Sequence, residues 1–324
     1  RILVSTISSL LKNLEVLAIK QFDTLIIDEA SQVVEPQLIG LLARFKRFIL
    51  IGDEKQLPAV VVQPERGVAV RDEELNEAGI FDLRTSIFER LITRCKAQGW
   101  TEAFGIISKQ GRMHSDIATF PNTAFYDGVL SPLTERQTRS VSPTLFEDSA
   151  AAYSDISEQE WHRVKNTLSS QRLVFWHSEE EHQTKVHEGE ARRAALLAEA
   201  FRKELGDTFH EGSIGIITPF RAQIAAIYRL LPAELHESIS VDTVERYQGS
   251  ERDIIILSFA VNFPSQLRSV QSLSTNDKID RKLNVALTRA RERMVVLGRA
   301  EILSHSPILR RFIGFVQSQG GFVG

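Results

Sequence analysis

Cysteine is nearly missing from this sequence, which contains only Cys95 among its 324 residues. A single thiol excludes an internal disulfide, and no group of cysteine and histidine residues has the spacing of a zinc site. We therefore expect a reducing, cytoplasmic compartment and an inert thiol. Apart from His114, the histidines are expected to lie on the surface.

Long apolar runs are also missing, since no segment approaches the roughly 20 residues that span a bilayer, and the amino end does not have the layout of a signal peptide. We expect a soluble protein without a membrane partner. The formal net charge is −3, which excludes a globally basic nucleic-acid binder but leaves room for a groove with a local basic lining. The sequence starts at Arg1 and continues directly into apolar residues, so we expect it to be part of a longer protein.

Short β-branched runs alternate with helical patterns, which indicates an α/β protein with parallel sheets and crossover helices. The length and the 43% hydrophobic content predict two domains, and a boundary near Lys109 divides them into residues 1–109 and 110–324. The expected buried strands are Ile2–Val4, Thr24–Ile27, Phe48–Ile51, Leu173–Phe175, Ile214–Ile217, Ile254–Leu257 and Met294–Leu297.

Helical spacing of apolar residues predicts helices around 191–205, 224–231 and 309–316. Two of these helices have start signals, because Thr218 before Pro219 and Ser306 before Pro307 fit a cap followed by proline in the first turn. Residues 130–170 and 262–282 have no sustained period, so both are predicted to be loop-rich insertions.

Polar residues follow two neighbouring predicted strands, at the edge where open parallel sheets bind ligands. Asp28 and Glu29 come directly after the first strand. One such carboxylate can hold Mg²⁺ on phosphates and the other can take a proton from an attacking water, although a solvated acidic loop is an equally open interpretation. After the next strand, Gly52 permits a tight turn and Gln56 can sense a terminal phosphate, unless this is only a polar loop closed by Pro58.

These residues and several later segments closely resemble superfamily 1 nucleic-acid helicases of the Upf-like group, typified by the nonsense-mediated-decay RNA helicase. The sequence DEAS at 28–31 matches motif II, and GDxxQLP at 52–58 matches motif III. Later motifs follow in the family's order, with QGRMH at 110–114, FYDG at 125–128, TPF at 218–220, TVERYQGSE at 243–251 and LNVALTRAR at 283–291. The resemblance implies two RecA-like domains of the P-loop NTPase type, the first truncated at its amino end.

In the family, Asp28, Glu29, Gln56, Arg112 and Arg289 would be catalytic, with Asp28 also holding the metal. A guanidinium binds phosphate oxygens bidentately and stabilises the charge that develops during transfer. The alternative for each arginine is a solvated surface residue. The resemblance further assigns Gln248, Gly249, Glu251, Arg291 and Asp53 to the nucleotide, with Glu251 accepting the ribose hydroxyls.

Contacts to the nucleic-acid backbone are implied for Ser5, Thr6, Thr218, Pro219 and Thr243. Short hydroxyls read no base identity, and elsewhere they serve as helix caps or turn formers. We expect Asp28 and Glu29 from one domain to face Arg112 and Arg289 from the other across a cleft.

The sequence departs from the family pattern at two places. It has no glycine-rich loop ending in Lys and Ser or Thr, so we expect that loop upstream of Arg1 and poor nucleotide binding by the isolated piece. Gly111 stands where well-known members have a tyrosine that stacks on adenine, which leaves base selectivity open.

The leading hypothesis is an ATP- and Mg²⁺-dependent helicase that moves from 5′ to 3′ along single-stranded or partly duplex DNA or RNA. The alternative is a catalytically inactive nucleic-acid-binding scaffold. A dinucleotide-dependent oxidoreductase is set aside, because no glycine-rich fingerprint follows a strand.

Overall fold

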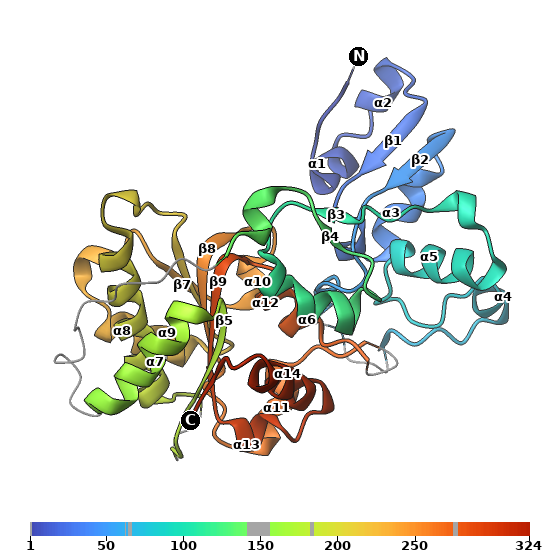
Figure 1. Cartoon of the computed structure of the whole chain (residues 1–324). Coiled ribbons are helices and arrows are strands. Elements are labelled where there is room, and N and C mark those ends of the chain that lie inside the picture. Colours follow the sequence, from blue (N-terminus) through green and yellow to red (C-terminus); the bar gives the residue numbers. More distant parts are fainter. Residues whose placement is uncertain (1, 62, 64–66, 141–155, 182–184, 275–277) are drawn as a thin grey trace. The chain divides into compact units, whose positions relative to one another are not determined.

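A computed structural model describes residues 2–61, 63, 67–140, 156–181, 185–274 and 278–324. The chain divides into two compact units, residues 1–106 and residues 107–324, each described below by itself (Figure 1). Within the described ranges, no helix has the length and apolar character needed to cross a membrane.

Unit 1 is built around a two-stranded parallel sheet, in which Thr24 is paired with Arg47 and Ile27 with Leu50. Its elements are the helices α1 (Ile7–Lys12), α2 (Val16–Ile19), α3 (Glu35–Leu42), α4 (Glu73–Glu77) and α5 (Ile87–Gln98), the strands β1 (Thr24–Ile27) and β2 (Arg47–Leu50), and the 3₁₀ helices η1 (Ala30–Gln32) and η3 (Thr101–Ala103). One side of the sheet packs on the helices through a core of Ile27, Ala30, Leu38, Leu42 and Ile87.

The prediction that the first two sheet strands are buried on both faces is wrong for unit 1. Alternate residues of a strand point to opposite faces, so Ile27 is buried while Ile26 is 62% exposed and Ile49 is 51% exposed. The predicted strand Ile2–Val4 does not form either, and Ile2 is 93% exposed. A run of apolar residues becomes a strand only where a neighbouring strand pairs with it, and none of the described residues pairs with this run.

Unit 2 contains a six-stranded parallel sheet with the order β10-β5-β9-β8-β6-β7. The strands are β5 (Leu173–His177), β6 (Ile214–Ile217), β7 (Ser240–Asp242), β8 (Arg252–Ser258), β9 (Ala290–Gly298) and β10 (Phe322–Val323), and the short strands β3 (Lys109–Gln110) and β4 (Ser131–Pro132) form a separate parallel pair. The helices are α6 (Ser115–Phe125), α7 (Glu158–Ser170), α8 (Glu188–Leu205), α9 (Arg221–Leu230), α10 (Val244–Tyr247), α11 (Leu267–Val270), α12 (Arg281–Leu287), α13 (Ala300–Leu303) and α14 (Pro307–Ser318), with 3₁₀ helices η4 (Glu135–Thr138), η6 (Gly206–Thr208), η7 (Ala233–Leu235) and η8 (Pro264–Gln266).

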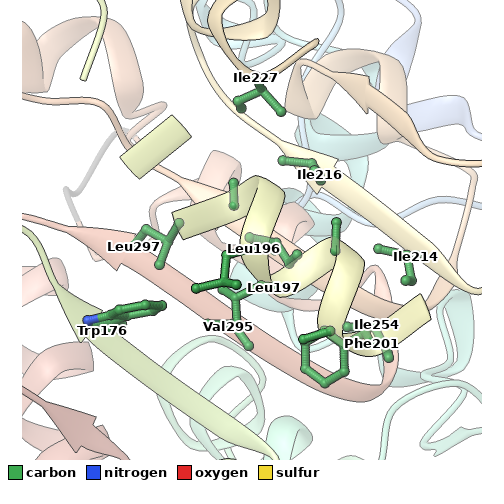
Figure 2. Close-up of a cluster of buried hydrophobic side chains, with 14 of the residues drawn as sticks. Trp176, Leu196, Leu197, Phe201, Ile214, Ile216, Ile227, Ile254, Val295 and Leu297 are labelled. Atoms are coloured by element: carbon green, nitrogen blue, oxygen red, sulfur yellow. The ribbon is translucent and has the colours of Figure 1, made fainter. Parts of the chain in front are cut away.

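Both faces of the large sheet are buried, as expected for a parallel sheet with crossover helices. Trp176 and Val295 lie in a cluster with residues of α7, α8 and α9, and Figure 2 shows Leu197 and Phe201 of α8 in the same cluster. On the other face, α14 packs against β5 and β10, and Phe312 of α14 makes an edge contact with Phe120 of α6 at 5.1 Å between ring centroids. Each fully buried large aliphatic side chain stabilises the fold by about 1.5–3 kcal/mol, so this unit has a substantial core.

The remaining predictions for unit 2 are confirmed at most elements and wrong at three points. The expected β5, β6, β8 and β9 form, as do α8, α9 and α14, and Ser306 caps α14 by accepting from Leu309 N at 3.4 Å. Thr218 is not a cap, because α9 begins at Arg221 after Phe220. Residues 130–170 are not uniformly loop-rich, since 158–170 form α7, while 141–155 lie outside the described residues. His187 is buried at 1% exposure, because its Nδ1 accepts from Glu190 N at the start of α8.

Candidate functional site

The acidic pair of unit 1 occupies the turn directly after β1. Glu29 has a left-handed backbone with φ of 52°, and its N–H donates to Oδ1 of Asp28 at 3.0 Å. The turn is fixed on the other side by the N–H of Ala30, which donates to the carbonyl of Ile51 at 2.8 Å. Gln32 donates to the Glu29 carboxylate at 2.7 Å, and both acidic side chains are exposed. A non-glycine residue in this backbone region costs about 1–2 kcal/mol, and the surrounding bonds hold it there.

The second turn, after β2, is packed directly against the first. Asp53 N donates to the hydroxyl of Ser31 at 3.3 Å, and a side chain at Gly52 would place its Cβ 3.0 Å from Ser31 N. Glycine permits this close approach of the two turns without strain, whereas a side chain would require Ser31 to shift. The Asp53 carboxylate accepts from Lys55 N and from the amide of Gln56, each at 2.9 Å. Asp53 therefore orients Gln56, and the two predicted residues form one local structure.

Three charged residues predicted for unit 2 come together in what we call the arginine cluster, made of Arg112, Glu251 and Arg291 together with Asp253, which the sequence does not indicate. Nε of Arg112 donates to Oε2 of Glu251 at 2.6 Å, and its NH1 donates to the carbonyl of Thr288 at 3.3 Å. Arg291 lies 3.8 Å from Glu251 and 3.5 Å from Asp253. The hydrogen bond from Arg112 holds the pKa of the Glu251 carboxyl below its usual value, and the charge of Arg291 adds to this effect.

Arg289 lies beside this cluster but in a different environment, since it is only 2% exposed. Its Nε donates to the carbonyl of Val285 at 3.1 Å, NH1 donates to the carbonyl of Ser250 at 3.2 Å, and NH2 donates to the hydroxyl of Thr288 at 3.0 Å. The Arg112 side chain, in contrast, is 32% exposed. Of the two arginines predicted to be catalytic, Arg112 thus lies at the surface and Arg289 lies inside the unit.

Gln248 and Gly249 form the turn that follows α10 and leads to the cluster. Gly249 has φ of 80°, a conformation that glycine adopts without strain. Nε2 of Gln248 is buried and has no hydrogen-bond partner within the described part of the chain. An unpaired buried amide has a free-energy penalty of about 1–3 kcal/mol, which a ligand acceptor at this position would relieve.

The predicted nucleic-acid residues are placed differently in the two units. In unit 1, Ser5 and Thr6 are exposed, and Thr6 caps α1 by accepting from Ser9 N at 3.2 Å. In unit 2, Thr218 follows β6 and Thr243 follows β7, and the N–H of Thr218 donates to the carbonyl of Asp242 at 3.1 Å. Thr218 is fully buried, whereas Thr243 and Pro219, the residue after Thr218, are partly exposed.

The two sets of predicted residues in unit 2 lie at opposite ends of the strands of its parallel sheet. Thr218 and Thr243 follow the carboxyl ends of their strands, whereas Glu251 precedes β8 and Arg289 precedes β9. The expectation that ligand-binding residues follow strands therefore describes the hydroxyl residues and the acidic turns of unit 1, but not the arginine cluster.

Besides Asp253, three residues of unit 2 that contact this region are not indicated by the sequence. Arg136 and Gln137 hydrogen-bond to the segment that carries Arg112, and Glu292 pairs with Arg136. Arg136 and Gln137 lie in residues 130–170, the stretch predicted to be a loop-rich insertion. Glu292 directly follows the last motif. No signal in a single sequence indicates that these residues meet.

The residues present fit a magnesium ion that is held largely by phosphates. The described ranges contain no group of three or more His, Cys, Asp or Glu side chains able to hold a metal alone. Magnesium in nucleotide sites is commonly bound through one or two carboxylates together with substrate phosphates. The exposed Asp28 is compatible with that arrangement.

Comparison with known proteins gives concordant matches along the chain. Residues 83–301 match the protein family described as AAA domain, and residues 1–64 match a second family with that description. The chain is 30% identical to DNA polymerase alpha-associated DNA helicase A of Saccharomyces cerevisiae, over 87% of this chain and 39% of the relative. It is 29% identical to DNA replication ATP-dependent helicase/nuclease DNA2 of Bos taurus, over 93% of this chain and 27% of the relative. A solved complex of Arterivirus nonstructural protein 10 (helicase) with DNA aligns over 85% of this chain and 40% of its own, with 12% identity and a TM-score of 0.37.

A parallel sheet with helices on both faces, together with these family matches, defines an α/β protein of the RecA-like, P-loop NTPase type. More specifically, the chain belongs to the AAA-domain family, and the two curated relatives described above are helicases. It spans less than half the length of the two curated relatives described above.

Proposed function

We propose that this chain is most of the motor core of an ATP-dependent helicase that moves from 5′ to 3′ along single-stranded DNA or RNA in the cytoplasm. The observation that carries the proposal is the arginine cluster, which brings Arg112, Glu251 and Arg291 together from three separate motifs. A solvated surface has no physical need to collect these motif residues at one edge of a sheet. The proposal includes a phosphate-binding loop from a part of the full-length protein upstream of Arg1.

In unit 1, the proposed chemistry depends on the two acidic residues and on Gln56. Asp28 would hold the Mg²⁺ of bound Mg²⁺–ATP, which supplies the phosphoryl group for transfer to water. Glu29 would take a proton from the attacking water, because its exposed carboxylate is fixed by the turn after β1. Gln56, oriented by Asp53, would direct that water.

In unit 2, Arg112 would contact the phosphate that is transferred and stabilise the charge developing on it. Glu251 would accept the ribose hydroxyls, and Gln248 would donate its unpaired amide to the nucleotide. Arg289, with its donors directed to Ser250, Val285 and Thr288, would hold the segments on which Arg112 and Glu251 depend, and would reach nucleotide only if those bonds rearrange. ATP hydrolysis would then drive the movement of nucleic acid held at Thr243 and Pro219.

The test uses the full-length protein, with ATP hydrolysis measured in the presence and absence of single-stranded DNA or RNA. Glu29→Gln should retain ATP binding and lose turnover, while the control Glu77→Gln, at an exposed position on α4, should behave like the wild type. Duplexes with a single-stranded 5′ tail should be unwound faster than those with a 3′ tail. A wild-type protein that binds nucleic acid but does not hydrolyse ATP would instead establish the scaffold alternative.

A further inference from the structure

The backbone that carries Arg112 is held by the neighbouring segment 134–140. Gln137 makes the central hydrogen bonds between the two segments. Gln137 is fully buried in η4. Its amide nitrogen donates to the carbonyls of Gln110 and Met113, both at 2.8 Å, so it bridges the two sides of Arg112. Its amide oxygen accepts from the N–H groups of Leu133 and Thr134, both at 2.9 Å. A buried amide with all its bonds satisfied is a rigid support.

Arg136 adds a direct contact to Arg112 itself. NH2 of Arg136 donates to the carbonyl of Arg112 at 2.7 Å and to the carbonyl of Gly111 at 3.2 Å. NH1 of Arg136 pairs with Oε1 of Glu292 on β9. The other oxygen of Glu292 accepts from Arg172 at 3.0 Å, and the Arg172 side chain is only 8% exposed. The chain of contacts from Arg112 therefore ends on β9 and at Arg172, the residue directly before β5.

These contacts decide where the Arg112 guanidinium lies, because residues 111–113 belong to no helix or strand. Apart from the support by segment 134–140, this turn is held by Gln110, whose Oε1 accepts from Arg112 N at 3.0 Å, and by a bond from His114 N to the carbonyl of Arg291 at 2.8 Å. Removing Arg136 would take away two of the bonds that hold this turn, those to the carbonyls of Gly111 and Arg112, and would therefore loosen the position of Arg112 relative to Glu251. A misplacement of about 1 Å at a phosphoryl-transfer site can lower the rate by about 100-fold.

We propose that Arg136, anchored by Glu292, is a positioning residue that fixes Arg112 for phosphoryl transfer. The proposal rests on the function proposed above for Arg112. The competing interpretation is an ordinary surface ion pair, which contributes little to either stability or activity.

The test compares ATP hydrolysis by full-length variants at saturating single-stranded nucleic acid. Arg136→Ala should lower kcat by about 10-fold or more with little change in KM for ATP, as expected for loss of a transition-state contact. Arg136→Lys, which keeps a charged donor, should recover much of this loss. The matched control is Arg139→Ala, because Arg139 contacts His114 and Arg172 through its backbone carbonyl, which the substitution retains.

A double-mutant cycle separates positioning from a general structural role. If Arg136 acts through Arg112, then adding Arg136→Ala to Arg112→Ala should cause no further loss of kcat. An equal fold-loss in both backgrounds would overturn the proposal, as would normal kcat in Arg136→Ala. Full activity of Arg112→Ala would instead contradict the function proposed for Arg112.

A second measurement does not require catalysis. Hydrogen exchange of the Arg112 Nε–H, which is protected by its bond to Glu251, should be faster in Arg136→Ala than in the wild type. Thermal unfolding of every variant checks that it folds, and Glu292→Gln takes the place of Arg136→Ala if the latter does not. Unchanged exchange and unchanged kcat in Glu292→Gln would then reject the proposal.

Discussion

Arg112 and Glu251 are 139 positions apart in the sequence, yet Nε of the arginine donates to Oε2 of the carboxylate at 2.6 Å. The pair satisfies the charge of both residues while leaving part of each side chain exposed. Any ligand hydroxyl that binds Glu251 must therefore compete with Arg112 or join it on the same carboxylate. In the proposed function, release of Arg112 toward a phosphate and binding of a ribose by Glu251 would thus be coupled through one hydrogen bond.

The first prediction concerns the ionisation of Glu251. Arg112→Ala removes the main cause of its lowered pKa, so the pKa of Glu251 should rise toward the usual value of 4.5. In the wild type, the carboxylate contributes stability that is present above the unfolded pKa and is lost as pH falls through the lower folded pKa. Carboxyl NMR titration of both proteins checks this, with Glu251→Gln identifying the signal. An identical titration curve in the two proteins would show that Arg112 does not govern the ionisation of Glu251.

The second prediction distinguishes Arg289 from the exposed arginine of the same motif. Arg289→Lys cannot reach Val285, Ser250 and Thr288 together, because lysine is a single point donor and not a planar fork. Leaving buried acceptors unpaired should lower the free energy of unfolding by about 1–3 kcal/mol. The control Arg291→Lys, whose side chain is 37% exposed, should change it by less than about 1 kcal/mol. Urea unfolding measures both, and equal effects would argue against a structural role for Arg289.

The third prediction uses the contact between the two turns of unit 1. Gly52→Ala would force its Cβ to 3.0 Å from Ser31 N, so it should destabilise the chain by about 1–3 kcal/mol. Gly40→Ala is a matched control with the opposite sign. Gly40 is exposed in α3, and its added Cβ would meet nothing within 4 Å, so helix propensity should stabilise by about 0.5–1 kcal/mol. Thermal unfolding that shifts in the same direction for both variants would contradict the close approach of the turns.

The fourth prediction concerns Tyr247, whose pKa is raised to about 12 because the phenol is buried. Its hydroxyl also donates to the carbonyl of Ser240 at 2.6 Å. Since the pKa of Tyr247 in the folded protein exceeds the usual value of 10.0, the associated stability is complete below about pH 10 and is lost as pH rises toward 12. Phenolate absorbance should therefore show one of the four tyrosines titrating late. That late fraction should be missing in Tyr247→Phe, and its persistence would assign it to another tyrosine.

The central strands of unit 2 could be predicted from the sequence because β-branched runs such as Ile254–Leu257 are apolar on both faces. α7 could also have been predicted. Ser157 accepts from Glu160 N at 3.1 Å in a capping arrangement that the spacing of these two residues indicates, and Trp161, Val164 and Leu168 follow helical spacing. The high Ser, Thr, Glu and Gln content around α7 favours a loop and hides the helical spacing of its apolar residues.

The candidate site was only partly predictable. The motifs identified Arg112, Glu251 and Arg289, but the buried position of Arg289 also involves the carbonyl of Ser250 on a distant segment, a contact that one sequence does not reveal. The support of Arg112 by Gln137 likewise depends on the pairing of β3 with β4, two strands of two residues each. Such short strands have no periodicity to detect.

The predicted residues lie at opposite ends of the strands of the large sheet, so a movement of the sheet would affect both sets of residues. β8 extends for roughly 20 Å at about 3.3 Å per residue, and it is hydrogen-bonded to β6 on one side and to β9 on the other. The residues of β8 from Ile254 to Ser258 are buried, so this strand cannot bend independently of its neighbours. A displacement of the sheet at the position where Glu251 and Arg112 meet would therefore also displace Thr218 and Thr243, because β8 is paired with β6 and β6 is paired with β7.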